Sequence, residues 1–301
     1  MLTRYATPAI SSTLFRLKKL QVEGEDWQRN RKITSQSFNE RNSKLVWKEA
    51  LQQAQPMLQS WVQEGLKGSV RTQQDALTLA LHVLTSAVFG LAYAFDSRDQ
   101  RVQPGYSMTY GDALSTVMKN LVVVFAVPHR LLLSPMAPAR FRVLGEAIED
   151  CKKYMEEFVS LERRLIEKRD SGNEHLLGSL VRNSDTMKAS ATLPDTKRRG
   201  LDEEEIYGNL FIFGIAGHET TANALGYGIM LLAASPQYQD WIQEELTMVL
   251  GNSSPDTWDY EESFPRLKRC LAIMVSHTRL IGFRSVAAYK LPASVRDAQA
   301  L

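Results

Sequence analysis

The chain has 301 residues, of which 44% are hydrophobic, 23% charged and 9% aromatic, and it carries 36 Lys and Arg against 34 Asp and Glu. This composition suits a globular protein with a large core and excludes a fibrous repeat or a wholly disordered chain. A net charge of +2 gives no indication of a nucleic-acid partner. Two cysteines cannot form the disulfide framework of a small secreted protein.

The first half of the chain predicts a succession of helices. Apolar residues recur at helical spacing, charged residues occupy the other faces, and no alternating pattern typical of a strand extends beyond a few residues. Three prolines in PHRLLLSPMAPAR, residues 128–140, break the helical pattern. The expected helices cover residues 24–38, 40–66, 75–95, 111–127 and 139–170.

The second half begins with NSDTMKASATLPDTKRRG, residues 183–200, which its composition predicts to be a flexible surface loop. Asp202 then has the position of a helix N-cap, and Glu205 three residues later completes an approximate capping box. A long central helix is expected to start there, so the predicted fold class is mostly α. Ser235-Pro236 is expected to end the central helix, and Gly251 is expected to end the helix that follows. Residues 264–280 are expected to form a last helical run.

Residues 76–95, ALTLALHVLTSAVFGLAYAF, lack Asp, Glu, Lys and Arg and reach the length of a membrane span. Asp75 and Asp96 flank them, however, where a basic cluster would be typical of a span. A core helix explains the segment better, because its large apolar residues repeat at steps of three and four while His82 and Thr85 lie off that stripe. A membrane-embedded helical protein is the weaker alternative.

Residues 209–230, NLFIFGIAGHETTANALGYGIM, are apolar enough for a buried helix, yet four glycines interrupt them. Each glycine costs a helix interior roughly 1 kcal/mol relative to alanine, so something is expected to approach this backbone closely. A neighbouring helix or a flat cofactor could do so, and a cofactor would find a carboxyl and a hydroxyl in Glu219 and Thr220. A zinc-protease helix is excluded, because Ala222 stands where its second His is required. The glycines are Gly214, Gly217, Gly226 and Gly228.

The run AGHETT, residues 216–221, resembles the Ala/Gly-Gly-x-Asp/Glu-Thr-Thr/Ser signature of the cytochrome P450 family of heme-thiolate monooxygenases. In that family this long helix crosses the distal face of the heme. The resemblance implies that Thr220 opens the helical hydrogen-bond ladder to make an oxygen pocket, and that Glu219 helps to deliver protons there. It also implies that Ala216 and Gly217 contact the cofactor.

A second segment, GEDWQRNRKITSQSF at residues 24–38, is similar to the family's Trp-x-x-x-Arg helix. A spacing of four places Trp27 and Arg31 on one helix face. The resemblance implies that the indole N–H and the guanidinium bind the two propionate carboxylates of the heme, for which an arginine fork is well suited. Taken alone, with Arg29 and Lys32 beside them, these residues would indicate a solvated basic helix.

The run ESFPRLKRCLAIM, residues 262–274, resembles the approach to the family's next conserved helix in its fungal-type version, so the resemblance spans residues 22–280. The family continues with a buried Glu-x-x-Arg pair. Arg279 keeps the arginine of that pair, but Ser276 stands where the glutamate is expected, and a buried arginine without its carboxylate costs several kcal/mol. The tail, residues 281–301, does not resemble the family.

The family's heme-ligating loop, with its cysteine, has no counterpart in the chain. Cys151 lies in a charged helical stretch and is expected to be half-exposed, whereas Cys270 follows Lys268 and Arg269, which predict a lowered thiol pKa. Neither is expected to bind iron, and no metal ligand is assigned. We therefore expect a partial P450-like helical domain at residues 1–280, truncated at both ends, and a divergent tail.

The resemblance implies a heme-dependent monooxygenase that oxidises a lipophilic small molecule with electrons from an NADPH-dependent reductase. Full-length relatives are expected at the endoplasmic reticulum membrane, whereas a chain without the N-terminal anchor is expected in the cytoplasm or at an unknown location. Without the cysteine loop and the missing glutamate, these 301 residues are expected to retain little or no heme and to show no turnover. The alternative is a non-catalytic helical remnant or a binding module without heme.

Overall fold

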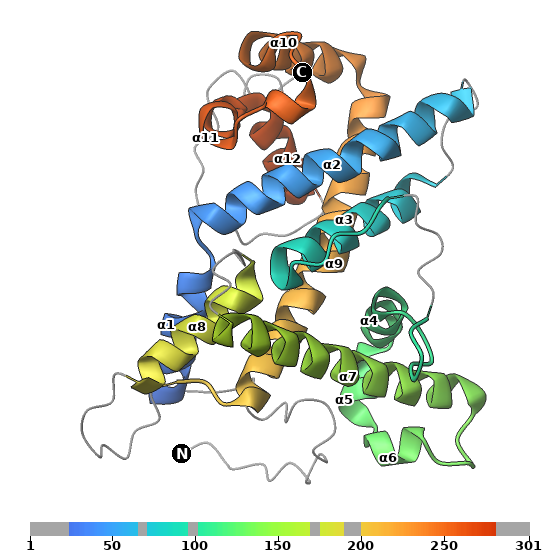
Figure 1. Ribbon diagram of the computed structural model, residues 1–301. Helices are drawn as coiled ribbons and strands as arrows, with labels where there is room; N and C mark the ends of the chain where they lie inside the picture. The colour runs from blue at the N-terminus through green and yellow to red at the C-terminus, as the bar shows by residue number, and fades with distance from the viewer. Residues whose placement is uncertain (1–23, 66–70, 96–101, 169–174, 190–199, 281–301) are drawn as a thin grey trace, which may run out of the picture. The chain divides into compact units, whose positions relative to one another are not determined.

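The computed structural model describes residues 24–65, 71–95, 102–168, 175–189 and 200–280, and throughout these ranges the regular structure is helical (Figure 1). The predicted mostly-α class is therefore confirmed. The α-helices are α1 (Gly24–Ser37), α2 (Glu40–Glu64), α3 (Thr72–Phe89), α4 (Tyr110–Lys119), α5 (Leu121–Ala126), α6 (His129–Leu132), α7 (Ala139–Glu167), α8 (Leu176–Ala189), α9 (Glu203–Ala234), α10 (Pro236–Leu250), α11 (Tyr260–Ser263) and α12 (Lys268–Leu280). Two 3₁₀ turns, η3 (Pro255–Thr257) and η4 (Phe264–Arg266), flank α11.

The chain forms two compact units. One contains the residues up to Pro56 together with Leu81–His218, and the other contains Met57–Ala80 and the residues from Glu219 onward. Helices α2, α3 and α9 each contribute residues to both units. The expected division of the sequence at residue 280 stays a prediction, because the tail beyond it lies outside the described residues.

The helix expected over residues 111–127 is divided into α4 and α5. The break lies at Asn120, whose φ of −121° and ψ of 23° are not helical. Its side-chain amide donates to the carbonyl of Thr116 at 2.8 Å, and its own N–H bonds back to the last turn of α4. Asparagine competes for helical hydrogen-bonding groups in this way, which favours a helix end over a continued helix.

The prediction of a loop at residues 183–200 is wrong for its first part, because α8 continues to Ala189. Residues 190–199 lie outside the described part of the chain. The polar composition of the segment predicted a loop, yet one face of α8 is buried in the core of the first unit. Ser184 shows how a polar residue fits there: its hydroxyl accepts a hydrogen bond from the Leu201 N–H at 2.8 Å. Burial of one apolar stripe outweighs the weak helix propensity of such residues.

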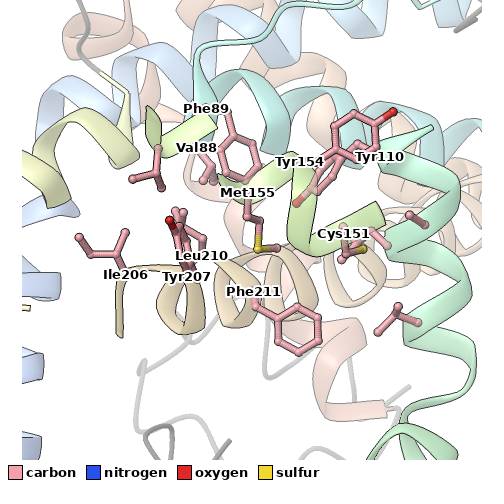
Figure 2. Close-up of a cluster of buried hydrophobic side chains, with 14 of the residues drawn as sticks. Val88, Phe89, Tyr110, Cys151, Tyr154, Met155, Ile206, Tyr207, Leu210 and Phe211 are labelled. Carbon is pink, nitrogen blue, oxygen red and sulfur yellow. The ribbon is translucent and has the colours of Figure 1, made fainter. Parts of the chain in front are cut away.

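The core of the first unit combines side chains from α3, α4, α7, α8 and α9 (Figure 2). Aromatic rings form much of it, and they adopt the offset or edge-on arrangements that the ring quadrupole favours. The ring of Tyr110 meets the rings of Phe89 and Phe158 edge-on, with centroids 5.5 Å apart in each pair. This core supports the first half of α9, where Leu210 and Phe211 are buried.

Helix α3 confirms the prediction of a core helix, although the buried face is wider than its large apolar residues indicated. His82 and Thr85, which lie off the apolar stripe, are buried with exposures of 3% and 1%. The helix ends at Phe89 because Gly90 follows in the left-handed region at φ +70°. Within the described ranges, no helix combines the length and the apolar character that crossing a membrane requires.

The core of the second unit is smaller and uses small residues. Ala76 and Ala80 of α3 pack with Ala222 of α9, and Leu77 and Leu225 lie against them. Alanine lets two helix backbones approach closely, which places α3 and α9 in direct contact here.

Candidate functional site

The central helix begins as the sequence predicted. The Glu205 carboxylate accepts the Asp202 N–H at 2.9 Å, while the Asp202 carboxylate accepts the Glu205 N–H at 2.9 Å. These reciprocal bonds form the capping box, which satisfies two of the backbone donors that a helix start leaves unpaired. The start of α9 is therefore held in place by its own first turn.

The two predicted propionate ligands lie together on the surface of α1. Trp27 is 47% exposed, and the guanidinium carbon of Arg31 lies 5.0 Å from the centroid of its ring. A cation at this distance from an indole face is attracted by the ring quadrupole. The pair is accordingly pre-arranged, with an indole donor and a charged guanidinium on one accessible face.

Arg29, between these two residues, is not the solvated side chain that a basic helix predicts. It has 8% side-chain exposure and forms a bidentate ion pair with Glu205, with Nη2–Oε1 and Nη1–Oε2 distances of 2.6 and 3.0 Å. Its Nη1 also donates to the carbonyl of Gly200 at 2.7 Å. The hydrogen bond with Glu205 raises the pKa of Arg29, and burial only partly opposes it. Sequence reasoning missed this role, although Arg29 precedes buried Ile33 by four residues and so shares its helix face.

Side chains join α1 to α9 at three successive levels. Arg29 meets Glu205, the amide of Asn209 donates to that of Asn30 at 2.9 Å, and Phe38 just after α1 meets Phe213 edge-on at 5.1 Å. Residue numbers increase along both helices from one level to the next. The two helices therefore run in the same direction where these side chains meet.

The same face of α9 carries Ala216, one of the predicted cofactor residues. At 3.6 residues per turn, Glu205, Asn209, Phe213 and Ala216 fall within a sector of about 80° around the helix axis. Ala216 is exposed, unlike the buried Glu205. The face that α1 contacts at the start of α9 is thus accessible at Ala216, about three turns later.

Thr220 is exposed and Glu219 is partly exposed on α9. The chain thus offers an accessible hydroxyl beside a carboxylate in the middle of an apolar helix. A hydroxyl can both donate and accept a hydrogen bond, whereas an ionised carboxylate only accepts, so each of the two groups has the chemistry to exchange protons with a bound molecule. Their roles stay predictions.

Neighbouring side chains account for two of the four glycines. A Cβ at Gly217 would come within 2.7 Å of Leu84 Cδ1, and one at Gly226 would meet the Gln73 side chain more closely still. At Gly214 and Gly228 a Cβ would have ordinary contacts of 3.5 Å. Close packing therefore explains the missing Cβ at Gly217, while contact of Gly217 with a cofactor remains a prediction.

The predicted exposure of Cys151 and the predicted thiol pKa of Cys270 were both wrong. Cys151 is completely buried in α7, and burial raises the pKa of its thiol well above the ordinary range. Burial, followed by the charge of Glu245, raises the pKa of Cys270 to about 11, whereas its basic neighbours had predicted a lowered value. Iron binds thiolate, so both environments work against that role. The side chains of Ser276 and Arg279 lie outside the described residues.

Most of the chain matches proteins of one known family. The family model for Cytochrome P450 matches residues 12–272. Cytochrome P450 monooxygenase 124 of Postia placenta is 32% identical over 275 residues, which are 89% of this chain and 49% of the relative. A cytochrome P450 monooxygenase of Arthrobotrys oligospora is 28% identical over 292 residues, 92% of this chain and 48% of the relative.

Solved structures show the same fold. The crystal structure of the cytochrome P450DA heme domain matches with a TM-score of 0.58 at 21% identity, over 83% of this chain and 48% of that one. The chain thus spans about half the length of the curated relatives and of the solved structure that it matches.

Proposed function

Because this chain belongs to the cytochrome P450 family, we propose that it forms the part of a heme monooxygenase that covers the distal side of the cofactor and binds its propionates. The match to the family model confirms the family that AGHETT and the Trp27 helix predicted. The observation that carries the proposal is the shared face of α9, which α1 contacts at Glu205 and which is accessible at Ala216.

The described residues fit a heme. Trp27 and Arg31 present an indole N–H and a guanidinium on one exposed face, which suits two carboxylates held side by side. Ala216 exposes a side chain no larger than a methyl group on the neighbouring helix, which leaves room for a flat ring near its backbone. We assign the propionates to Trp27 and Arg31 and the ring to the Ala216–Gly217 turn.

Heme, when bound, would activate dioxygen so that one oxygen atom enters a lipophilic substrate and the other leaves as water, with two electrons and two protons consumed. Thr220 would donate its hydroxyl proton toward the oxygen site and regain one from the solvent side. Glu219, one residue before it, would accept and release protons there. Positioned groups of this kind contribute about 10²–10⁴-fold to proton-transfer steps.

Substrate and electron source are proposed by analogy with the relatives, which are named monooxygenases. We assign a lipophilic small molecule as substrate, an NADPH-dependent reductase as electron donor, and the endoplasmic reticulum membrane as the location of the complete enzyme. A polypeptide of these 301 residues alone has Ser276 in place of the expected glutamate and no cysteine loop. We therefore expect little heme retention and no turnover from it.

A hemin titration of the purified 301-residue chain tests the proposal. We expect weak binding, seen as a Soret shift, that Arg31→Leu and Trp27→Phe each reduce by about tenfold, since charge-assisted hydrogen bonds are among the stronger ones. Lys32→Leu is the matched control, because Lys32 is exposed on the same helix.

Three outcomes separate the alternatives. Hemin binding that is indifferent to Trp27 and Arg31 would refute the propionate assignment. A monodisperse, cooperatively melting chain without any hemin binding would favour the binding module. A stoichiometric heme complex with a thiolate-type carbon monoxide spectrum would contradict the expected lack of heme retention.

A further inference from the structure

Arg29, which forms a buried ion pair with Glu205, lies between the two proposed propionate ligands in the sequence. Arg29 is two residues from Trp27 and two from Arg31, yet it projects from α1 in a different direction and is buried. Glu205 has 3% side-chain exposure and belongs to the first turn of α9. A bidentate pair in such a setting fixes both distance and orientation, because both guanidinium nitrogens must stay opposite both carboxylate oxygens.

Each member of the ion pair is also bound by other groups. The Oε2 of Glu205 accepts the Asp202 N–H of the capping box at 2.9 Å. Arg29 reaches past this carboxylate to the Gly200 carbonyl at 2.7 Å. The other side of the guanidinium binds Asp26 of α1 at 3.1 Å. The guanidinium is therefore attached to the segment before α9, to its first turn and to α1 at the same time.

We propose that the Arg29–Glu205 pair sets the register of α1 along α9 and thereby places Trp27 and Arg31 for the cofactor; Arg29 is a positioning residue. This inference rests on the proposed function for its cofactor part. If α1 moved by one turn along α9, both ligands would move by about 5 Å, because the helix pitch is about 5.4 Å. Within the contact between α1 and α9, the Asn30–Asn209 bond is neutral and the edge-on Phe38–Phe213 contact is weaker than a charge-assisted pair, so neither restricts sliding along α9 as strongly.

Cross-linking measures the register without any cofactor. In one variant, cysteines replace Asn30 and Asn209, which are in contact. In a second variant, cysteines replace Thr34 and Asn209, which we expect to cross-link only after α1 has shifted by one turn along α9. Cys270→Ser removes the half-buried native thiol from both. With a short bifunctional thiol reagent, we expect the 30–209 pair to react about tenfold faster than the 34–209 pair, and Arg29→Gln or Glu205→Gln to bring the two rates within about twofold.

Hemin affinity measures the consequence for the ligands. We expect Arg29→Gln to weaken hemin binding about tenfold when Trp27 and Arg31 are present and to have little further effect in a chain that carries both Trp27→Phe and Arg31→Leu, because Arg29 acts through these two ligands. Asp150→Asn is the matched control: Asp150 is a buried carboxylate that accepts two backbone N–H groups far from α1 in sequence. Its loss lowers stability and should leave hemin affinity and the cross-linking preference unchanged.

Each outcome is decisive. A 30–209 preference that survives in both Arg29→Gln and Glu205→Gln would overturn the register role. A lost preference, together with an effect of Arg29→Gln on hemin affinity that is undiminished in the Trp27→Phe/Arg31→Leu chain, would overturn the link to the ligands. If the unsubstituted chain binds hemin independently of Arg31, the proposed function fails, and the cofactor part of this inference fails with it, while cross-linking still decides the register.

Discussion

At the scale of single residues, burial decides which polar side chains are structural. His82 lies in a buried network, where its Nδ1 is 2.9 Å from Gln53 Oε1. An amide oxygen only accepts, so Nδ1 must carry the proton in this tautomer. The amide nitrogen of Gln53 donates in turn to Glu49 at 2.8 Å and to the Tyr93 carbonyl at 2.6 Å. The Nδ1 proton of His82 is therefore used in this buried network.

This environment predicts a loss of stability in mild acid. Burial, the largest influence, lowers the pKa of His82, and the charge of Glu49 opposes it only in part. The unfolded chain has an ordinary histidine pKa of about 6.5 and takes up the proton first, so the free energy of unfolding should fall as pH drops from about 7 to about 5. Urea unfolding across this range measures the fall, and His82→Gln should flatten it. An equal pH slope in both proteins would show that His82 is not responsible.

At the scale of elements, α9 accommodates glycines because other helices approach it. Gly217 faces Leu84 of α3 within the first unit, where a Cβ would come too close. Gly214, one turn earlier, has room for a methyl group beside Leu114 and Tyr110. Close packing thus accounts for the missing Cβ at Gly217 but not at Gly214, and the sequence pattern alone does not separate the two positions.

Alanine substitutions should distinguish the two positions. Gly214→Ala should raise the free energy of unfolding by up to about 1 kcal/mol, the gain expected in a helix interior. Gly217→Ala should gain less or lose stability, because the Leu84 side chain must move. In a Leu84→Ala chain, Gly217→Ala should recover most of the helix gain. Equal effects of both single substitutions in urea unfolding would contradict the packing explanation.

At the scale of the whole molecule, the second half of α9 exposes large apolar side chains: Tyr227 is 46% exposed, Met230 52% and Leu231 39%. Clusters of this kind are typical of surfaces that associate. We expect Met230→Glu to reduce self-association in size-exclusion chromatography with light scattering, with an unchanged urea midpoint. Leu210→Glu, at a fully buried position of the same helix, should lower the midpoint instead. Unchanged self-association of the Met230→Glu variant would show that this surface does not mediate self-association.

Sequence patterns by themselves determined the helical class, the start of α9 at its capping box and the family, because each depends on residues close together in the chain or on short motifs. Only the tertiary structure decided which charges and thiols are buried. Arg29 with Glu205, His82 with Gln53, and Cys151 in the core all depend on neighbours that are distant in sequence or on packing from other helices. Local periodicity carries no information about those neighbours, since free energies of burial and ion pairing follow from contacts across the fold.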